Sequence, residues 1–157
     1  GKASNQPVHK LLGGKFHKSI DFFGFVQGRD PEEMADHASQ IFDEGFRVIY
    51  YKIGYSEKED LEITRTLRIK LGDDALLRPD INELYSEGEA KKLLLQMADY
   101  QIDWVEQPLG VYNIEGMALL RKMIPMRLAI DQGANTLEEI NRAINVQAAD
   151  VYVVGFH

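Results

Sequence analysis

Three short apolar segments of the sequence each end in a carboxylate. Asp80 ends the run in LLRPDIN, Glu106 the run in IDWVEQ, and Asp131 the run in RLAIDQ, at intervals of 26 and 25 residues. On neighbouring parallel strands, about 4.8 Å apart, carboxylates at equal depth converge on one point. Three such acids repel one another unless a cation lies between them, and oxygen-only ligands suit Mg²⁺. The pattern predicts a magnesium site made by these three residues.

A lysine occupies the matching position one apolar run earlier. Lys52 lies near the end of VIYYKIG, level with the acids by repeat position. A lysine at a strand end that is shielded from water and lies beside a divalent cation is expected to have a lowered pKa, which suits a general base. A base next to a metal indicates removal of a proton adjacent to a carboxylate, with the resulting enediolate stabilised by the metal.

Each of these residues also has a simpler explanation. A single strand-end acid is more often a solvated loop residue or a helix cap, and a single lysine more often lies on the surface. Asn82, two residues after Asp80, is either a turn residue or a substrate contact. Of the pair Tyr50 and Tyr51, one is expected in the core and the other in the wall of the site. The matched spacing is what favours the metal site.

The elements that position these residues follow a repeat of roughly 25 to 28 residues. Apolar runs without clean alternation are typical of parallel strands buried on both faces. Ser or Thr followed three residues later by Glu marks three helix starts, at 56–59, 86–89 and 136–139, and Asp30-Pro31 marks another. We count six strands and five helices. The expected strands cover residues 20–27, 47–54, 75–81, 102–107, 127–132 and 150–155.

Such a repeat demands a parallel sheet, and two α/β architectures fit it: an open doubly wound sheet, or an arc of a (β/α)₈ TIM-type barrel. Both place their active sites at the carboxyl ends of the strands. A complete barrel usually takes about 250 residues, so a barrel of 157 residues is expected to be incomplete, with about six parallel strands.

Composition restricts the class of protein. The net charge of −7 argues against a nucleic-acid partner, which requires a basic surface. There is no apolar run of membrane-spanning length and no signal peptide, so a cytoplasmic location without membrane contact is expected. The absence of cysteine excludes thiolate nucleophiles and Cys-based metal sites, which leaves oxygen or histidine ligands.

Together these motifs resemble the enolase superfamily, in its mandelate racemase and muconate-lactonizing enzyme branch. The opening GKASNQPVHKLLGG resembles the segment that leads from the family's capping domain into its barrel. EGFRVIYYKIG is similar to the second-strand motif Lys-x-Lys before a glycine, and RPDIN, WVEQP and AIDQG resemble the three metal-ligand strands in order. On this resemblance residues 1–19 are a lead-in segment, and residues 20–157 form a partial barrel catalytic domain.

The resemblance implies roles for individual residues. Asp80, Glu106 and Asp131 match the Mg²⁺ ligands, and Lys52 matches the usual base. Tyr50 and Asn82 are expected to contact substrate, a small-molecule carboxylate. The implied reaction is removal of the proton α to that carboxylate, leading to racemization, epimerization, cycloisomerization or dehydration by a lyase or isomerase. A homo-oligomer is also implied.

Two positions depart from the family pattern. Tyr50 replaces the first lysine of the motif, which removes a positive charge near Lys52. Gly155 stands where the family has a second base on the sixth strand, and His157 is a possible substitute two residues further on. A protein with one base favours dehydration slightly over epimerization.

The family's capping domain and its seventh and eighth strands are absent from these 157 residues. The chain is therefore expected to be an inactive fragment of a larger enzyme. The sheet of this fragment is expected to have an unpaired edge strand. The alternative is a non-catalytic member that keeps only the metal-binding scaffold. A third hypothesis, a doubly wound phospho-receiver or small-ligand module, is disfavoured because the sequence has no glycine-rich phosphate loop.

Overall fold

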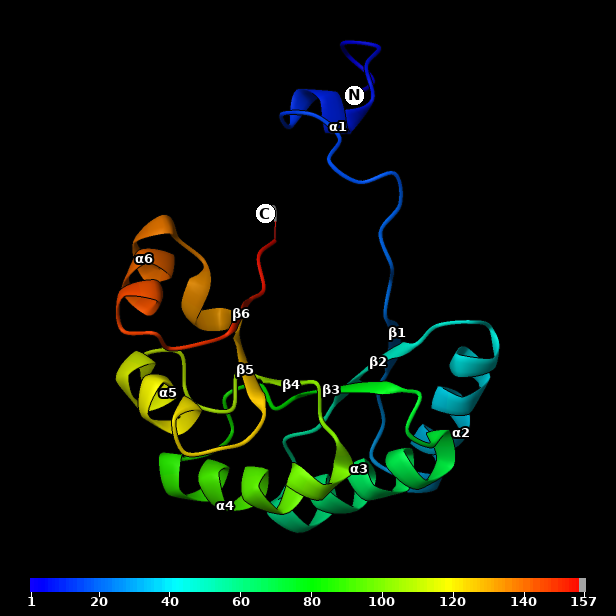
Figure 1. Ribbon diagram of the computed structural model, residues 1–157, viewed down its shortest axis with the longest axis vertical. Helices are drawn as coiled ribbons and strands as arrows, with labels where there is room; N and C mark the ends of the chain where they lie inside the picture. Colours follow the sequence, from blue (N-terminus) through cyan, green and yellow to red (C-terminus); the bar gives the residue numbers. More distant parts are fainter. Residues whose placement is uncertain (156–157) are drawn as a thin grey trace.

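The computed structural model describes residues 1–155, which contain one sheet of six parallel strands. The strand order is β1-β2-β3-β4-β5-β6, so every strand pairs with its neighbour in sequence (Figure 1). The elements are α1 (Val8–Leu11), β1 (Gly24–Val26), α2 (Pro31–Asp43), β2 (Val48–Lys52), α3 (Glu57–Leu71), β3 (Leu76–Asp80), α4 (Glu87–Met97), η1 (Ala98–Tyr100), β4 (Trp104–Glu106), α5 (Ile114–Arg121), β5 (Arg127–Ile130), η2 (Gln132–Ala134), α6 (Leu137–Asn145) and β6 (Val151–Tyr152).

The sequential strand order decides between the two predicted architectures. In a doubly wound sheet the strand order reverses and helices cover both faces. Here the order never reverses, and helices α2 to α6 follow one another around the outside of a curved sheet (Figure 1). The described residues therefore form an open arc of a (β/α) barrel, with the six strands and five main helices predicted from the sequence.

The helices begin where the sequence indicates. The Asp30 side chain accepts hydrogen bonds from the Glu32 and Glu33 N–H groups ahead of α2. Capping boxes open α4 at Ser86 and α6 at Thr136. The third predicted box is incomplete at Ser56: its hydroxyl caps the Glu59 N–H, but the Glu59 carboxylate bonds the Ser56 hydroxyl and Arg29 instead of the Ser56 backbone.

Strands are shorter than predicted at the two edges of the sheet. β1 has three residues and β6 two, where eight and six were expected. Each edge strand has a partner on one side only, so the apolar residues before β1, including Phe22 and Phe23, stay exposed. The apolar pattern predicts where each strand lies but not its length: β4, with a neighbour on each side, also has three residues where six were expected.

Alternation along β2 separates the core from the inner face of the arc. Ile49 and Tyr51 are fully buried, and the Tyr51 hydroxyl bonds Thr64 of α3 in the helical layer. Tyr50 and Lys52 point to the opposite face, because successive side chains of a strand alternate. The tyrosine pair is therefore split between the core and the inner face, as expected.

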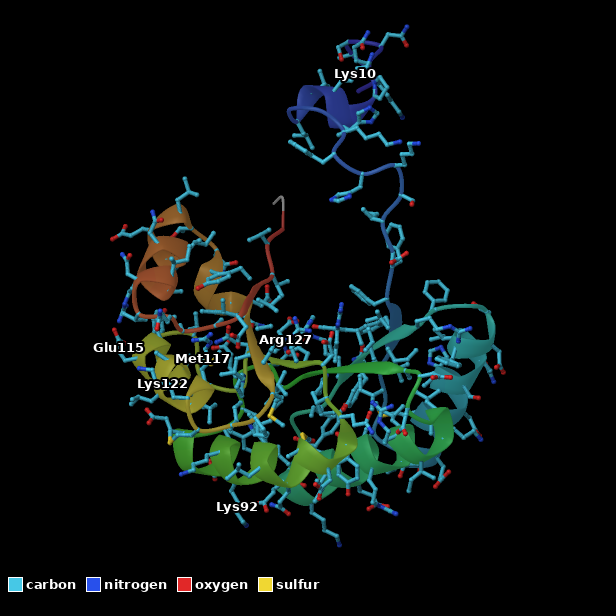
Figure 2. All side chains as sticks on the ribbon, viewed as in Figure 1. Lys10, Lys92, Glu115, Met117, Lys122 and Arg127 are labelled. Carbon is cyan, nitrogen blue, oxygen red and sulfur yellow. The ribbon has the colours of Figure 1, made fainter. Side chains whose placement is uncertain are left out.

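The N-terminal segment stands apart from the sheet. Every residue from 1 to 20 is exposed, and α1 extends away from the arc on its own (Figure 1). Figure 2 shows Lys10 on this segment, whereas Lys92 and Lys122 lie on the outer helical layer. Within residues 1–155, none of the helices is both long and apolar enough to span a bilayer.

Candidate active site

Asp80 and Glu106 lie side by side at the carboxyl ends of β3 and β4. They are register partners, and Lys52 at the end of β2 is the register partner of Asp80 on its other side. The three side chains therefore form one row across the sheet. Both carboxylates are buried, with 0% and 2% of their residue surface exposed, although an ionised carboxylate is costly to remove from water.

The Tyr50 hydroxyl lies between the two carboxylates. Its oxygen is 2.5 Å from Asp80 Oδ2 and 2.9 Å from Glu106 Oε1, so one hydroxyl proton is shared by two acceptors. The ring is packed against Phe23, Phe25 and Trp104, with ring centroids 4.9, 5.9 and 6.1 Å away. Aromatic packing fixes the hydroxyl in place. Burial, together with the hydrogen bond to Asp80, raises the pKa of Tyr50, which keeps the phenol protonated.

Lys52 completes the polar row. Its ammonium group pairs with Asp80 Oδ2 and donates to Asn82 Oδ1 at 2.9 Å. The Lys52 side chain is 28% exposed, so a substrate can reach it from the mouth of the arc. Asn82 is a turn residue with a φ of 51°, and its side-chain amide also donates to both oxygens of Asp80.

The turn after Lys52 is held by a glycine and a buried acid. Gly54 has a φ of 102°, and a Cβ at this position would lie 2.4 Å from the Ile81 carbonyl oxygen. Asp60, fully buried at the start of α3, accepts from the Gly54 and Tyr55 N–H groups and from the Tyr85 hydroxyl at 2.6 Å. This turn determines where β2 ends and hence where Lys52 stands.

Asp131 is not at the same depth as the other two acids, which differs from the sequence prediction. The register partner of Glu106 on β5 is Ala129, so Asp131 lies two residues further toward the carboxyl edge. Its N–H donates to Gln107 Oε1 at 3.0 Å, and Gly133 N–H approaches the same oxygen at 3.4 Å. Asp131 remains near enough for its charge to act on Glu106.

The buried acids of the site are not fully balanced by positive charge. Burial, followed by the charge of Asp80, raises the pKa of Glu106 from 4.5 to about 7. Glu106 Oε2 is buried and has no hydrogen-bond partner in the structure. A buried carboxylate with one unpaired oxygen and the charges of two further acids acting on it is the environment that a divalent cation relieves.

The three predicted ligands are not assembled in advance. Across residues 1–155, no three Asp, Glu, His or Cys side chains are placed to hold a metal together. Tyr50 and Lys52 bond to Asp80, and Asp131 lies two residues beyond the row. The donor set nevertheless fits a hard cation, because it consists of carboxylates and includes the unpartnered Glu106 Oε2.

Two residues that hold the site were not found from the sequence. Gln107 is fully buried with a φ of 36°, and its side chain links the ends of β4 and β5 by bonding Leu109 O and Asp131 N–H. The sequence feature that could have singled out Gln107 is its position before Pro108, because the backbone of a residue before proline is restricted and a positive φ is unusual there. Asp60 gave no signal, since an acid in the first turn of a helix is ordinary.

The sixth strand contributes no base among the residues described. β6 ends at Tyr152, and residues 153–155 are Val, Val and Gly. The predicted substitute, His157, lies outside the described residues.

A curved parallel sheet with helices outside and acids at the carboxyl ends of its strands defines a partial (β/α) barrel. The chain belongs to the enolase C-terminal domain-like family, whose model matches residues 33–156. Within the enolase superfamily it falls in the mandelate racemase and muconate-lactonizing branch.

The relatives are racemases, epimerases and cycloisomerases. The chain is 32% identical to N-succinyl-L-Arg/Lys racemase of Bacillus cereus over 96% of its length, and the crystal structure of that enzyme superposes with a TM-score of 0.93 over 98% of the chain. It is 26% identical to muconate cycloisomerase 1 of Pseudomonas putida over 98% of its length. A dipeptide epimerase from Cytophaga hutchinsonii, solved with Mg and the dipeptide D-Ala-L-Val, is 30% identical over 93% of the chain, with a TM-score of 0.88.

The chain covers only part of each of these proteins. It spans 41% of the racemase, 42% of the cycloisomerase and 40% of the epimerase. The sheet described above is therefore a part of the barrel that these enzymes contain.

Proposed function

We propose that this chain is the metal- and base-bearing part of a magnesium-dependent lyase or isomerase, which removes the proton α to a substrate carboxylate. The observation that carries the proposal is the row of Lys52, Asp80 and Glu106, with a buried Glu106 oxygen that has no partner. Asp80, Glu106 and Asp131 would hold the cation. A bound magnesium ion would supply positive charge that lowers the free energy of the enediolate left when the proton leaves.

Lys52 is the proposed base. Its amine lies on the inner face at the carboxyl edge and is open to the mouth of the arc, so it can reach a carbon next to a bound carboxylate. It now pairs with Asp80, and binding of Asp80 to a cation would weaken this pair and release the Lys52 side chain toward the substrate.

Tyr50 and Asn82 are the proposed contacts to the substrate. Both lie beside Lys52, and the Asn82 amide already bonds the Lys52 ammonium and Asp80. A hydroxyl and an amide next to the base can orient a substrate carboxylate by donating to its oxygens. The substrates named for three of the relatives, N-succinyl amino acids, dipeptides and muconate, carry such a carboxylate.

The outcome proposed first is dehydration, because Lys52 is the one base offered by the described inner face and β6 ends in residues without one. Epimerization is the second candidate. It is supported by the names of the relatives, which include a racemase and dipeptide epimerases.

We further propose that the 157 residues alone do not turn over substrate. The chain spans about 41% of its curated relatives, and its inner face is open along both edge strands. An open face does not exclude water or enclose a substrate.

The test is a D₂O assay of the full-length protein that carries these residues, with Mg²⁺ and a panel of N-succinyl amino acids, dipeptides, muconate and hydroxy acids. Nuclear magnetic resonance would detect deuterium at the α-carbon, inversion there, or loss of water. We expect Mg²⁺-dependent exchange that a chelator abolishes and that Lys52→Ala lowers by at least a hundredfold. Full exchange by Lys52→Ala would exclude Lys52 as the base, and the same assay on the 157-residue chain is expected to give none.

A further inference from the structure

The Asp80 carboxylate has no free hydrogen-bonding position. Oδ2 accepts from Tyr50, Lys52 and Asn82, and Oδ1 accepts from the Asn82 backbone and side chain. A carboxylate offers about four lone-pair positions in total. Glu106 differs, because Oε1 bonds Tyr50 and Oε2 has no partner. A cation can therefore approach Glu106 directly, but it reaches Asp80 only by displacing a donor.

Tyr50 is the donor in the way. Asn82 can release Oδ2 and keep its bond to Oδ1 at 2.9 Å, and Lys52 can keep its bond to Asn82. Tyr50 has no such alternative, because its hydroxyl contacts only the two carboxylates that the cation would bridge, at 2.5 and 2.9 Å. The ring cannot easily withdraw, since Phe23, Phe25 and Trp104 pack around it.

We propose that the Tyr50 hydroxyl is an internal competitor for the cation: it holds Asp80 and Glu106 together when the metal is absent and weakens metal binding by the cost of its displacement. The inference rests on the magnesium site proposed above. It gives Tyr50 a role before substrate arrives: the hydroxyl that later faces the substrate first keeps two buried carboxylates from repelling each other.

The test compares two tyrosines that are neighbours on β2. Tyr50→Phe removes the bridging hydroxyl and keeps the packed ring. Tyr51→Phe removes a hydroxyl on the opposite face, where it bonds Thr64 at 3.0 Å. Mg²⁺ affinity is measured by titration calorimetry on chelator-treated full-length protein at fixed pH and salt, and the thermal midpoint is measured without metal.

We expect Tyr50→Phe to bind Mg²⁺ about tenfold more tightly than wild type, because a hydrogen bond to a charged group no longer has to be broken. Its metal-free thermal midpoint should fall, and its gain on adding Mg²⁺ should rise. Tyr51→Phe should keep the wild-type affinity. If Tyr50→Phe does not fold in chelator, urea unfolding at rising Mg²⁺ gives the same comparison, with stabilisation starting at about tenfold lower Mg²⁺.

The outcomes separate the two proposals. Equal or weaker Mg²⁺ binding by Tyr50→Phe, while wild type binds, overturns the competitor role and leaves the magnesium site standing. Mg²⁺ binding by Tyr50→Phe, with no binding by wild type, supports the competitor role. If neither protein binds Mg²⁺, the magnesium site is wrong and the competitor role with it.

Discussion

Asp80 and Glu106 are register partners on adjacent strands, and both are almost completely buried with one tyrosine hydroxyl between them. Two acids in this position destabilise each other when both are ionised. Without a cation between them, these acids impose an electrostatic cost at the carboxyl edge of the sheet, and this cost depends on pH.

The first prediction concerns stability without metal. The pKa of Glu106 is raised from 4.5 to about 7, so the native protein binds a proton more readily than the unfolded chain between these values. The stability contributed by this proton is complete below pH 4.5 and is lost as the pH rises through about 7. We expect the thermal midpoint in chelator to fall from pH 5.5 to pH 8, and the gain from Mg²⁺ to grow over the same range.

The matched variants for this prediction are Glu106→Gln and Glu138→Gln. Glu138 is exposed on α6, so its variant should keep the wild-type pH dependence. Glu106→Gln should flatten it. An unchanged slope in Glu106→Gln would assign the pH dependence to another group.

The second prediction concerns the turn after the proposed base. Gly54→Ala places a methyl group 2.4 Å from the Ile81 carbonyl oxygen at a φ of 102°, so either the backbone or the strand end must move. We expect a loss of at least about 2 kcal/mol in the free energy of unfolding, measured in urea. Gly88→Ala is the control, because its Cβ meets nothing within 4 Å inside α4, and it should be neutral or slightly stabilising.

The third prediction concerns the link between β4 and β5. Gln107→Leu leaves the Asp131 N–H without its acceptor and the Leu109 carbonyl without its donor, both near buried backbone. We expect a loss of about 1–3 kcal/mol in the free energy of unfolding and weaker Mg²⁺ binding, because the hydrogen bond from the Asp131 backbone to Gln107 is lost. Gln40→Leu, at an exposed position of α2, should change neither. Unchanged Mg²⁺ binding in Gln107→Leu would show that this link does not position the third acid.

The fourth prediction concerns the buried acid of α3. Asp60→Asn replaces an acceptor-only group, bonded by two N–H groups and the Tyr85 hydroxyl, with one that also carries two donors. We expect a loss of about 1–3 kcal/mol in urea unfolding. Asp36→Asn should cost less than about 0.5 kcal/mol, because the Asp36–Lys70 pair is exposed to solvent. Similar losses for both variants would mean that Asp60 does not hold the turn.

Much of the fold was predictable because the signals are local. Ser86 and Thr136 begin their helices through side-chain contacts three residues apart, and the strand-end acids recur with the period of the repeat. Strand length was not predictable, since it depends on which residues pair with those of the neighbouring strands.

The site was predictable only in outline. Position in the repeat placed Lys52, Asp80 and Glu106 in one row, but the two-residue offset of Asp131 depends on the register of β4 and β5. The bridge made by Tyr50 joins residues 30 and 56 positions apart and depends on the packing of its ring. The sequence identified Tyr50 as a departure from the family motif without indicating what it contacts.

The strict sequential pairing of the strands has a consequence for how the chain acquires its structure. Each β/α unit touches mainly the units before and after it, so ordering can start at one unit and spread in both directions, as in a repeat protein. Contacts between residues close in sequence form before distant ones, which favours early pairing of consecutive strands. Asp80 and Glu106 lie on the consecutive strands β3 and β4, so these two acids are brought together as soon as two neighbouring units are ordered.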